Sequence, residues 1–184
     1  KGKYNKLQLT LGNFYEQFGS GLIFRTYEDR GLGIDNSLRG ALLTYNSGNI
    51  NIKGLFGYQR NYWKYTKESV KGIDAEIYLS EWIDFLKDNN IRMIVGSSFV
   101  SKYQQNELIM ASMFEKFNLP EHIGAFASRL RLQKNKVSLM TEFALKANDP
   151  NSENNYIYKN GHAFLLSGSF SQKGLGLILQ VKRS

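Results

Sequence analysis

Long stretches of this chain alternate between apolar and polar residues, and this pattern constrains the fold more than any other feature. The clearest example is the pair of segments 121–133 and 136–146. One face of the second segment carries Val137, Leu139, Thr141, Phe143 and Leu145, and the other carries Ser138, Met140, Glu142, Ala144 and Lys146. Successive side chains of a β-strand point to opposite faces, so this periodicity predicts strands. The two-residue connection Lys134-Asn135 predicts an antiparallel hairpin.

The same alternation recurs along the whole chain and predicts about ten strands. The predicted strands cover residues 5–13, 20–27, 37–46, 49–59, 70–80, 89–100, 121–133, 136–146, 161–171 and 174–183. Most are about 9–11 residues long, as a tilted strand must be to cross a bilayer, whereas strands of soluble domains are most often about 5–6 residues long. The composition agrees with long strands joined by turns, because 11 Tyr and 12 Phe accompany 17 Gly and only 2 Pro.

The predicted connections alternate between short and long. Short turns are expected at 46–48, 134–135 and 172–173, and long connections at 28–36, 60–69, 101–120 and 147–160. The segments 14–19 and 81–88 are intermediate in length, at positions where short turns are expected. Outer-membrane barrels have short turns at one end and long loops at the other. Within the longest connection, Gln104 to Asn118 is either a loop or a short helix that Pro120 closes.

These features together predict an all-β fold. No stretch of about 18 apolar residues is present, so the sequence predicts no transmembrane helix. Lipid offers no hydrogen bonds, and therefore only helices and closed barrels span a bilayer. We predict an antiparallel up-and-down transmembrane β-barrel of about ten strands, or an arc of a larger barrel. Residues 1–184 are expected to form a single barrel domain or barrel segment, and the abrupt strand-like ends favour a piece of a longer protein.

If the apolar face meets lipid, the opposite face points into the barrel lumen. The charged residues predicted to face the lumen are Arg25, Arg39, Lys53, Asp74, Glu76, Arg92, Arg129, Arg131, Glu142 and Lys146. In the core of a soluble sandwich, each such group would cost several kcal/mol unless it were paired. Aromatic residues near the predicted strand ends are typical of girdles at the two membrane interfaces, although Tyr and Trp favour strand ends in any case.

The sequence contains no recognisable catalytic or metal-binding motif. HExxH, paired cysteines, GxSxG and the P-loop are all missing, so we expect no catalytic residue, metal or cofactor. His122 and His162 are isolated from each other in the sequence. Asp74 and Glu76 lie two residues apart on one predicted face and are an example of a carboxylate pair that a hydrolase could use.

One loop carries an acidic cluster formed by Glu28, Asp29 and Asp35. Carboxylate oxygens are suitable Ca²⁺ ligands, but the EF-hand spacing is missing. We therefore favour salt bridges to neighbouring arginines, namely Arg25, Arg30 and Arg39. Two interpretations remain open: a charged constriction or plug-holding site at the barrel mouth, and a structural network that pins the loop.

A family resemblance adds to this interpretation. The most distinctive block spans residues 12–30 and begins Gly12-Asn13-Phe14-Tyr15-Glu16-Gln17-Phe18-Gly19-Ser20-Gly21; it continues through residues 32–41. This block, with residues 172–177 near the end, resembles a family of uncharacterised, porin-like outer-membrane β-barrel proteins of Bacteroidota. The resemblance implies a barrel in the outer membrane and no enzyme activity. It assigns no substrate and no catalytic residue.

We therefore expect a non-enzymatic protein of the bacterial outer membrane, either a porin-like channel or a membrane anchor within a larger assembly. Its expected partners are the lipid bilayer and other outer-membrane proteins, and inward Arg and Lys would favour anions in a pore. The alternative is a soluble β-sandwich or barrel that binds glycans through surface aromatics such as Trp63 and Trp82. The formal charge of +8 is spread along the chain without a basic block, so nucleic acid is not an expected partner.

Overall fold

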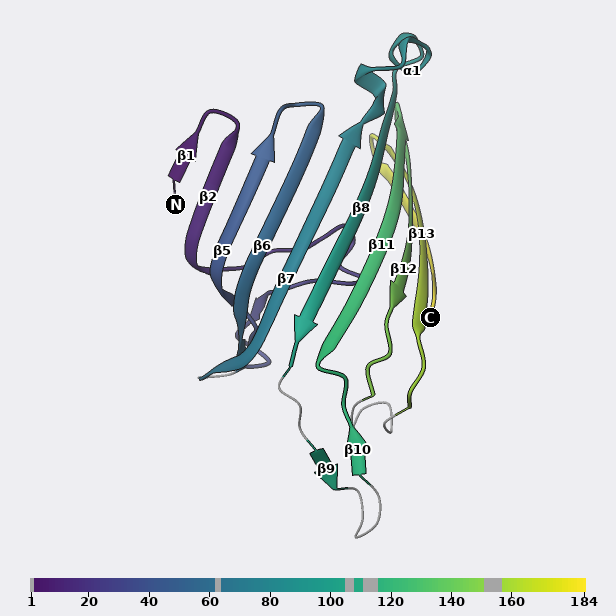
Figure 1. Cartoon of the computed structure of the whole chain (residues 1–184). Coiled ribbons are helices and arrows are strands. Elements are labelled where there is room, and N and C mark those ends of the chain that lie inside the picture. The colour runs from purple at the N-terminus through teal and green to yellow at the C-terminus, as the bar shows by residue number, and fades with distance from the viewer. Residues whose placement is uncertain (1, 62–63, 105–107, 111–115, 151–156) are drawn as a thin grey trace.

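The computed structural model describes residues 2–61, 64–104, 108–110, 116–150 and 157–184. Ten strands form a single antiparallel sheet in the order β1-β2-β5-β6-β7-β8-β11-β12-β13-β14 (Figure 1). Their bounds are β1 Gly2–Tyr4, β2 Leu7–Phe14, β5 Leu38–Asn46, β6 Ile50–Asn61, β7 Lys64–Tyr78, β8 Ile91–Tyr103, β11 His122–Lys134, β12 Val137–Lys146, β13 Gly161–Gln172 and β14 Leu175–Arg183. The predictions of an all-β fold and of antiparallel strands are confirmed.

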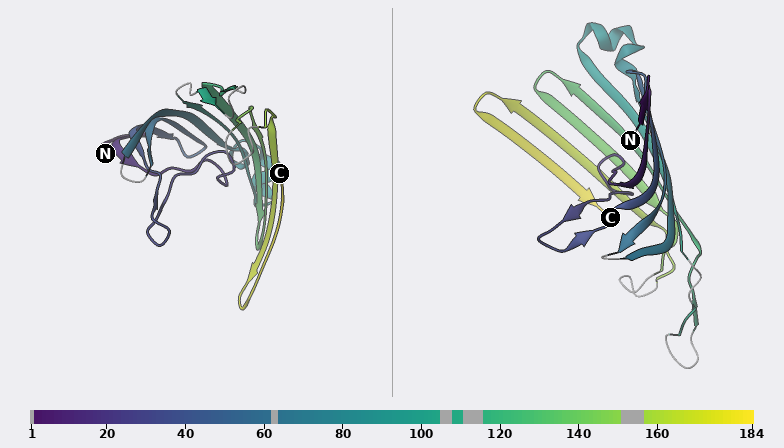
Figure 2. Two further views of the ribbon diagram at one scale, coloured as in Figure 1. Left: turned by 90° about the horizontal axis from the view of Figure 1, so that it is seen from below. Right: turned by 90° about the vertical axis from the view of Figure 1, so that its left-hand side faces the viewer.

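The sheet is an up-and-down meander, because each of these strands pairs with the next one along the chain. It bends into a deep trough, with β1 at one edge and β14 at the other (Figure 2). Several hairpin turns use residues that tolerate the left-handed backbone, such as Asn135 with φ 51° and Gly174 with φ 82°. Closure of the strands into a barrel remains a prediction.

The smaller elements lie in the connections. At the end of the trough that carries the tight turns, the 3-10 helix Leu79–Glu81 and the short helix α1, Asp84–Asp88, join β7 to β8. At the opposite end, β3 (Glu28–Asp29) pairs with β4 (Ile34–Asp35), and β9 (Leu108–Met110) pairs with β10 (Lys116–Asn118). We call this second end the loop end.

Three local predictions are wrong. Residues 20–27 do not form a strand of the sheet but belong to the long connection between β2 and β5. The helix considered for Gln104–Asn118 is replaced, at 108–110 and 116–118, by the two short strands β9 and β10, and residues 105–107 and 111–115 lie outside the described part. The long loop expected at 60–69 is mostly strand, because β6 and β7 extend to Asn61 and from Lys64.

The two faces of the sheet differ in what covers them. Apolar side chains on the convex face are exposed, as for Ile73, which is 53% exposed, and Phe99, which is 48% exposed. These two residues lie directly opposite each other on β7 and β8. On the concave face, the buried residues Leu38, Leu42, Leu55, Val70 and Val100 form a core with three phenylalanines, Phe14, Phe18 and Phe24. The concave side therefore contains the only hydrophobic cluster found among the described residues.

Candidate functional site

The candidate site is built around residues 15–27, which turn back into the trough after β2 ends. We call this stretch the inserted segment; it lies within the curve of the sheet when the trough is viewed along its length (Figure 2). The alternation stops at Phe14, and Gly19 (φ 54°) and Gly21 (φ 89°) adopt left-handed backbone that permits a tight reversal. The segment is closed on itself by two hydrogen bonds, from the Phe18 amide to the Phe24 carbonyl and from the Thr26 amide to the Glu16 carbonyl.

Phe18 fixes the inserted segment to the wall of the trough. Its side chain is completely buried, and its ring centroid lies 5.1 Å from that of Phe24. Gly72 on β7 makes room for this ring, since a Cβ at that position would lie 2.7 Å from Phe18 Cε2. Burying an aromatic ring in this way stabilises a contact by several kcal/mol, so Phe18 is the main apolar anchor of the segment.

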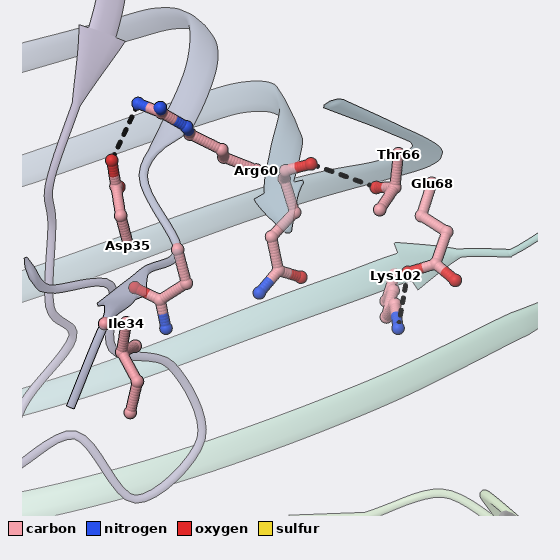
Figure 3. A pocket seen from close by; sticks show the side chains of 9 residues that line it. Ile34, Asp35, Arg60, Thr66, Glu68 and Lys102 are labelled. Carbon is pink, nitrogen blue, oxygen red and sulfur yellow. Dashed lines mark hydrogen bonds and ion pairs between the residues drawn. The ribbon is translucent and has the colours of Figure 1, made fainter. Parts of the chain in front are cut away.

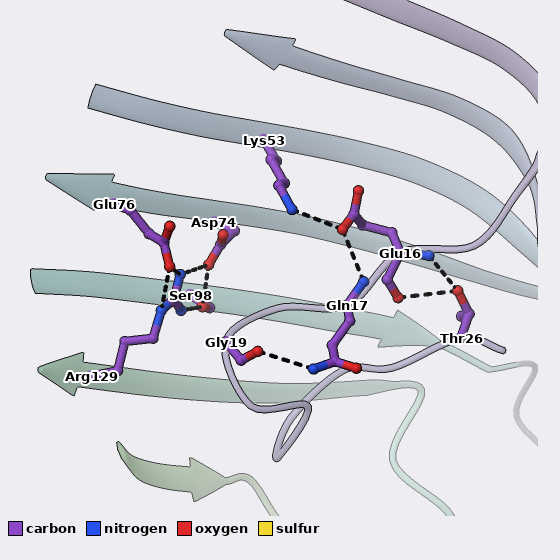
Figure 4. A network of polar contacts seen from close by, with 9 residues as sticks. All are labelled: Glu16, Gln17, Gly19, Thr26, Lys53, Asp74, Glu76, Ser98 and Arg129. Atoms are coloured by element: carbon purple, nitrogen blue, oxygen red, sulfur yellow. Dashed lines mark hydrogen bonds and ion pairs between the residues drawn. The ribbon is translucent and has the colours of Figure 1, made fainter. Parts of the chain in front are cut away.

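Two polar contacts also hold the segment to the wall. Lys53 on β6 donates to Glu16 Oε1 at 2.8 Å, and the Ser20 amide donates to Glu142 Oε2 at 2.8 Å (Figure 4 for the first). Glu142 is only 1% exposed, and a Cβ on Gly19 would lie 2.8 Å from its carboxylate oxygens. A buried carboxylate is costly without hydrogen bonds, so the segment and Glu142 stabilise each other.

A buried ionic network lies deeper in the trough, on β7, β8 and β11 (Figure 4). Arg129 Nη2 lies 2.6 Å from Asp74 Oδ1 and 2.9 Å from Glu76 Oε1. Ser98 Oγ accepts from Arg129 Nη1 and donates to Asp74 Oδ1, both at 2.6 Å. Gly96 lies directly between Glu76 and Arg129 in the register, and a Cβ there would lie 2.7 Å from Arg129 Nε. The missing side chain lets Arg129 reach across β8.

The structure brings together half of the charged residues that were predicted to face the lumen. Lys53, Asp74, Glu76, Arg129 and Glu142 lie on the concave face in the two groups just described. Three others share their strand face without joining these groups: Arg92, Arg131 and Lys146. Arg131 Nη2 lies 3.9 Å from the Met140 sulfur, and Lys146 pairs with Asp149.

The remaining two arginines differ: Arg25 lines a cavity with Val70 and Val100 of the concave face, whereas Arg39 does not face inward. Arg25 is exposed within the inserted segment, and its guanidinium lies 4.9 Å from the Tyr27 ring centroid. Arg39 lies opposite Asn13 and Tyr58, so it shares the convex face with Ala41 and Leu43. The expected inward position of Arg39 is therefore wrong. The reason is that Leu38 and Leu42, taken as the lipid face, instead pack inward against the inserted segment.

The acidic loop cluster is held by ion pairs and hydrogen bonds. Arg30 pairs with Glu28 at 2.9 Å, and Asp29 accepts from the Leu32 amide at 3.1 Å. Asp35 pairs with Arg60 of β6 at 2.7 Å, so the partner is neither Arg25 nor Arg39. Within the described ranges, no group of three or more His, Cys, Asp or Glu side chains is arranged to hold a metal ion.

A polar cavity of about 430 Å³ opens beside this cluster at the loop end (Figure 3). Two ion pairs border it, Asp35 with Arg60 and Glu68 with Lys102, each at 2.7 Å. The cavity is therefore lined by two positive side chains, by two negative ones and by uncharged polar residues such as Thr66. The cavity suits small polar solutes better than apolar ones.

Asp35 gives the loop end a predictable response to pH. The pKa of Asp35 is lowered, chiefly because the Ser37 amide donates to its carboxylate at 3.1 Å; burial opposes this, and Tyr15 and Arg60 lower it further. A lowered folded-state pKa gives stability that is present above the unfolded value and is lost as the pH falls through the folded one. We expect the Ser37 amide resonance to titrate below the ordinary Asp value of about 3.9. NMR in micelles checks this, and Asp35→Asn should remove the transition without removing those of other carboxylates.

The sequence interpretation missed several residues of this site. Glu16, Phe18, Ser98, Arg60 and Lys102 carry its main contacts, yet none was singled out for a role. Phe18 and Glu16 lie in a stretch without alternation, where no local signal reports a distant partner. Gly72 and Gly96 are the detectable signals, because glycine inside a long strand marks a close approach by another group.

Comparison with known proteins identifies the family of this chain but assigns no activity to it. No helix among the residues described here is long and apolar enough to cross a membrane. No curated protein and no solved structure matches the chain significantly. The model of one family, described as a family of unknown function (DUF6029), matches residues 1–184. Because this match covers the meander, the inserted segment and the ionic network alike, the chain belongs to the DUF6029 family.

Proposed function

We propose that the chain forms the wall of a β-barrel in the bacterial outer membrane and serves as a membrane anchor whose interior is narrowed by the inserted segment. The observation that carries the proposal is the contrast between the two faces. Large apolar side chains are exposed on the convex face, whereas the charged network is buried on the concave face. An apolar patch of this extent is unfavourable in water and favourable against acyl chains.

The distribution of charge supports the same proposal. At the strand positions of the convex face, as the described registers define it, neither Asp nor Glu occurs. Most of the tight turns lie at one end of the strands and most of the long connections at the other, as in outer-membrane barrels, and the close connection between β6 and β7 at the loop end is the exception. The proposed location is the outer membrane, and the proposed partners are its lipids and neighbouring outer-membrane proteins.

An anchor is favoured over an open porin because the inserted segment occupies the interior and the cations nearest to it or in the buried network, Lys53 and Arg129, are paired. Arg129 is matched by two carboxylates and Lys53 by Glu16, so neither cation is free to select anions. A porin-like channel is the second candidate. The polar cavity at the loop end favours it, because such a cavity could form the entrance if the inserted segment moved.

The two faces can be distinguished with single cysteines, because the chain has no native cysteine. Leu139 and Met140 are neighbours on β12 with side chains on opposite faces, and they therefore lie at matched depth. We expect a fluorophore on Leu139→Cys in liposomes to be quenched several-fold more by doxyl-labelled lipid than one on Met140→Cys. Fluorescence quenching measures this difference.

Solubility separates this proposal from glycan binding. If the protein stays monomeric in aqueous buffer without detergent, and both cysteine positions resist lipid quenching, the membrane proposal is wrong. Oligosaccharide titration with tryptophan fluorescence would then test the soluble alternative, for which Trp82, 56% exposed beside α1, is the described reporter.

A further inference from the structure

The convex face carries a set of basic side chains near the loop end. Arg39, one residue from the loop-end start of β5, and Lys71, at the middle of β7, are both exposed, and Lys67 lies on the same face of β7. In the register, Arg39 lies opposite Tyr58 on β6, and Lys71 lies opposite Phe56, two residues further along the same strand. The two cations therefore lie on either side of β6, offset by two residues, and the convex face around them carries both apolar side chains and uncharged polar ones such as Ser69.

Both cations lie over aromatic rings. The Arg39 guanidinium is 5.4 Å from the centroid of Tyr65, whose hydroxyl donates to Asn13 Oδ1 at 3.1 Å. Lys71 Nζ is 6.0 Å from the centroid of Phe56, and the Phe56 and Tyr58 rings meet edge to face at 5.7 Å. Such stacking holds each side chain against the sheet and leaves its outer N–H groups directed away from the protein.

Neither cation has a carboxylate within ion-pair distance among the described residues. Cations on a lipid-facing barrel surface are costly at the bilayer midplane but cheap close to the headgroups, where long side chains reach the interface. Arg39 lies one residue from the loop-end start of β5, and on β7 Lys71 precedes the convex apolar residues Ile73 and Ile77, so both cations lie on the loop-end side of apolar residues of their own strands. An anionic group of the membrane lipids would neutralise the positive charges of Arg39 and Lys71.

We propose that Arg39 and Lys71 bind the phosphates of anionic lipid headgroups in the leaflet that surrounds the loop end. Arginine suits phosphate because its planar fork donates two parallel hydrogen bonds, and lysine adds a point charge. The acyl chains of the same lipids would lie along the apolar convex side chains below. This inference rests on the proposed membrane function, because it requires the convex face to meet lipid.

The test compares lipid retention by the full chain after reconstitution into phosphatidylcholine bilayers that contain a minor fraction of phosphatidylglycerol. The protein is extracted in neutral detergent, and the lipid that stays bound is identified by mass spectrometry. We expect the wild type to retain phosphatidylglycerol selectively and Arg39→Gln/Lys71→Gln to retain about tenfold less, as loss of charge-assisted hydrogen bonds predicts. The matched control Lys87→Gln/Lys136→Gln removes two exposed charges at the opposite end and should behave like the wild type.

Three further results decide the matter. The swap Arg39→Lys/Lys71→Arg keeps both charges and should retain phosphatidylglycerol within about twofold of the wild type. Equal retention by the glutamine variant and the wild type would overturn the lipid site. Insertion into pure phosphatidylcholine is measured for every sample: a wild type that inserts without lipid preference overturns only this site, whereas one that fails to insert overturns the membrane proposal as well.

Discussion

Replacing Arg129 by leucine is expected to destabilise the fold by about 3–5 kcal/mol, because removing one partner of a buried ionic group leaves uncompensated charges. Arg129 forms ion pairs with both Asp74 and Glu76 and also donates to Ser98, all on the concave face. Without it, the two carboxylates would face each other inside the trough. Guanidinium unfolding in detergent micelles, followed by circular dichroism, measures the loss as a lower midpoint.

The control for this prediction lies two residues away. Arg131 shares the strand and face of Arg129, but its side-chain contact is the Met140 sulfur at 3.9 Å. Arg131→Leu should therefore cost less than about 1 kcal/mol. Adding Asp74→Asn and Glu76→Gln to Arg129→Leu should restore much of the lost stability, since the two carboxylates that lost their ion pair are then replaced by neutral amides. An Arg129→Leu protein as stable as the wild type would contradict the role given to this network.

Replacing Phe18 by alanine is expected to release the inserted segment from the trough. Truncating a fully buried Phe costs about 3–5 kcal/mol, which corresponds to a change of about a hundredfold or more in the population of the undocked state. A cysteine at Ser20 reports undocking, because the Ser20 contact to Glu142 uses the backbone amide and survives the substitution. We expect Ser20→Cys to react with a maleimide at least tenfold faster when Phe18→Ala is also present.

Leu32 provides the matched control, because it lies in the same connection between β2 and β5 but is 71% exposed. Leu32→Ala should leave the reactivity of Ser20→Cys within about twofold, as expected for surface substitutions. If Phe18→Ala also raises ion conductance in planar bilayers while Leu32→Ala does not, the channel alternative gains support over the anchor. Unchanged labelling in the Phe18→Ala protein would show that the segment is held by its polar contacts alone.

The strands could be predicted from the sequence because alternation is a local property. A residue and its second neighbour share a face wherever the chain is extended, so β11 and β12 are visible in the sequence without knowledge of their neighbours. The inserted segment is different. Leu22, Phe24 and Thr26 alternate as a strand would, but tertiary contacts with the wall decide their conformation, and Phe24 is buried beside Phe18.

The position of Arg39 illustrates the same limit within a true strand. Alternation correctly separates Arg39 from Leu38 and Leu42, but it cannot say which of the two sets faces outward. Apolar residues were assumed to face lipid, whereas here Leu38 and Leu42 pack against phenylalanines supplied from elsewhere in the chain. A trough with a filled interior therefore has two apolar surfaces, and sequence alone does not distinguish them.

The network around Arg129 also determines how the strands can be aligned. If β8 slid by two residues against β7 and β11, every side chain would keep its face, so the apolar pattern offers little resistance to such an error. The gap at Gly96 would then move away from the line that joins Glu76 to Arg129, and Ser98 would leave its place opposite Asp74. The ion pairs among Asp74, Glu76 and Arg129, of which Asp74 and Arg129 are buried, would then be disrupted. These polar residues therefore favour one register of β8 over other registers that would keep the same apolar side chains on the same face.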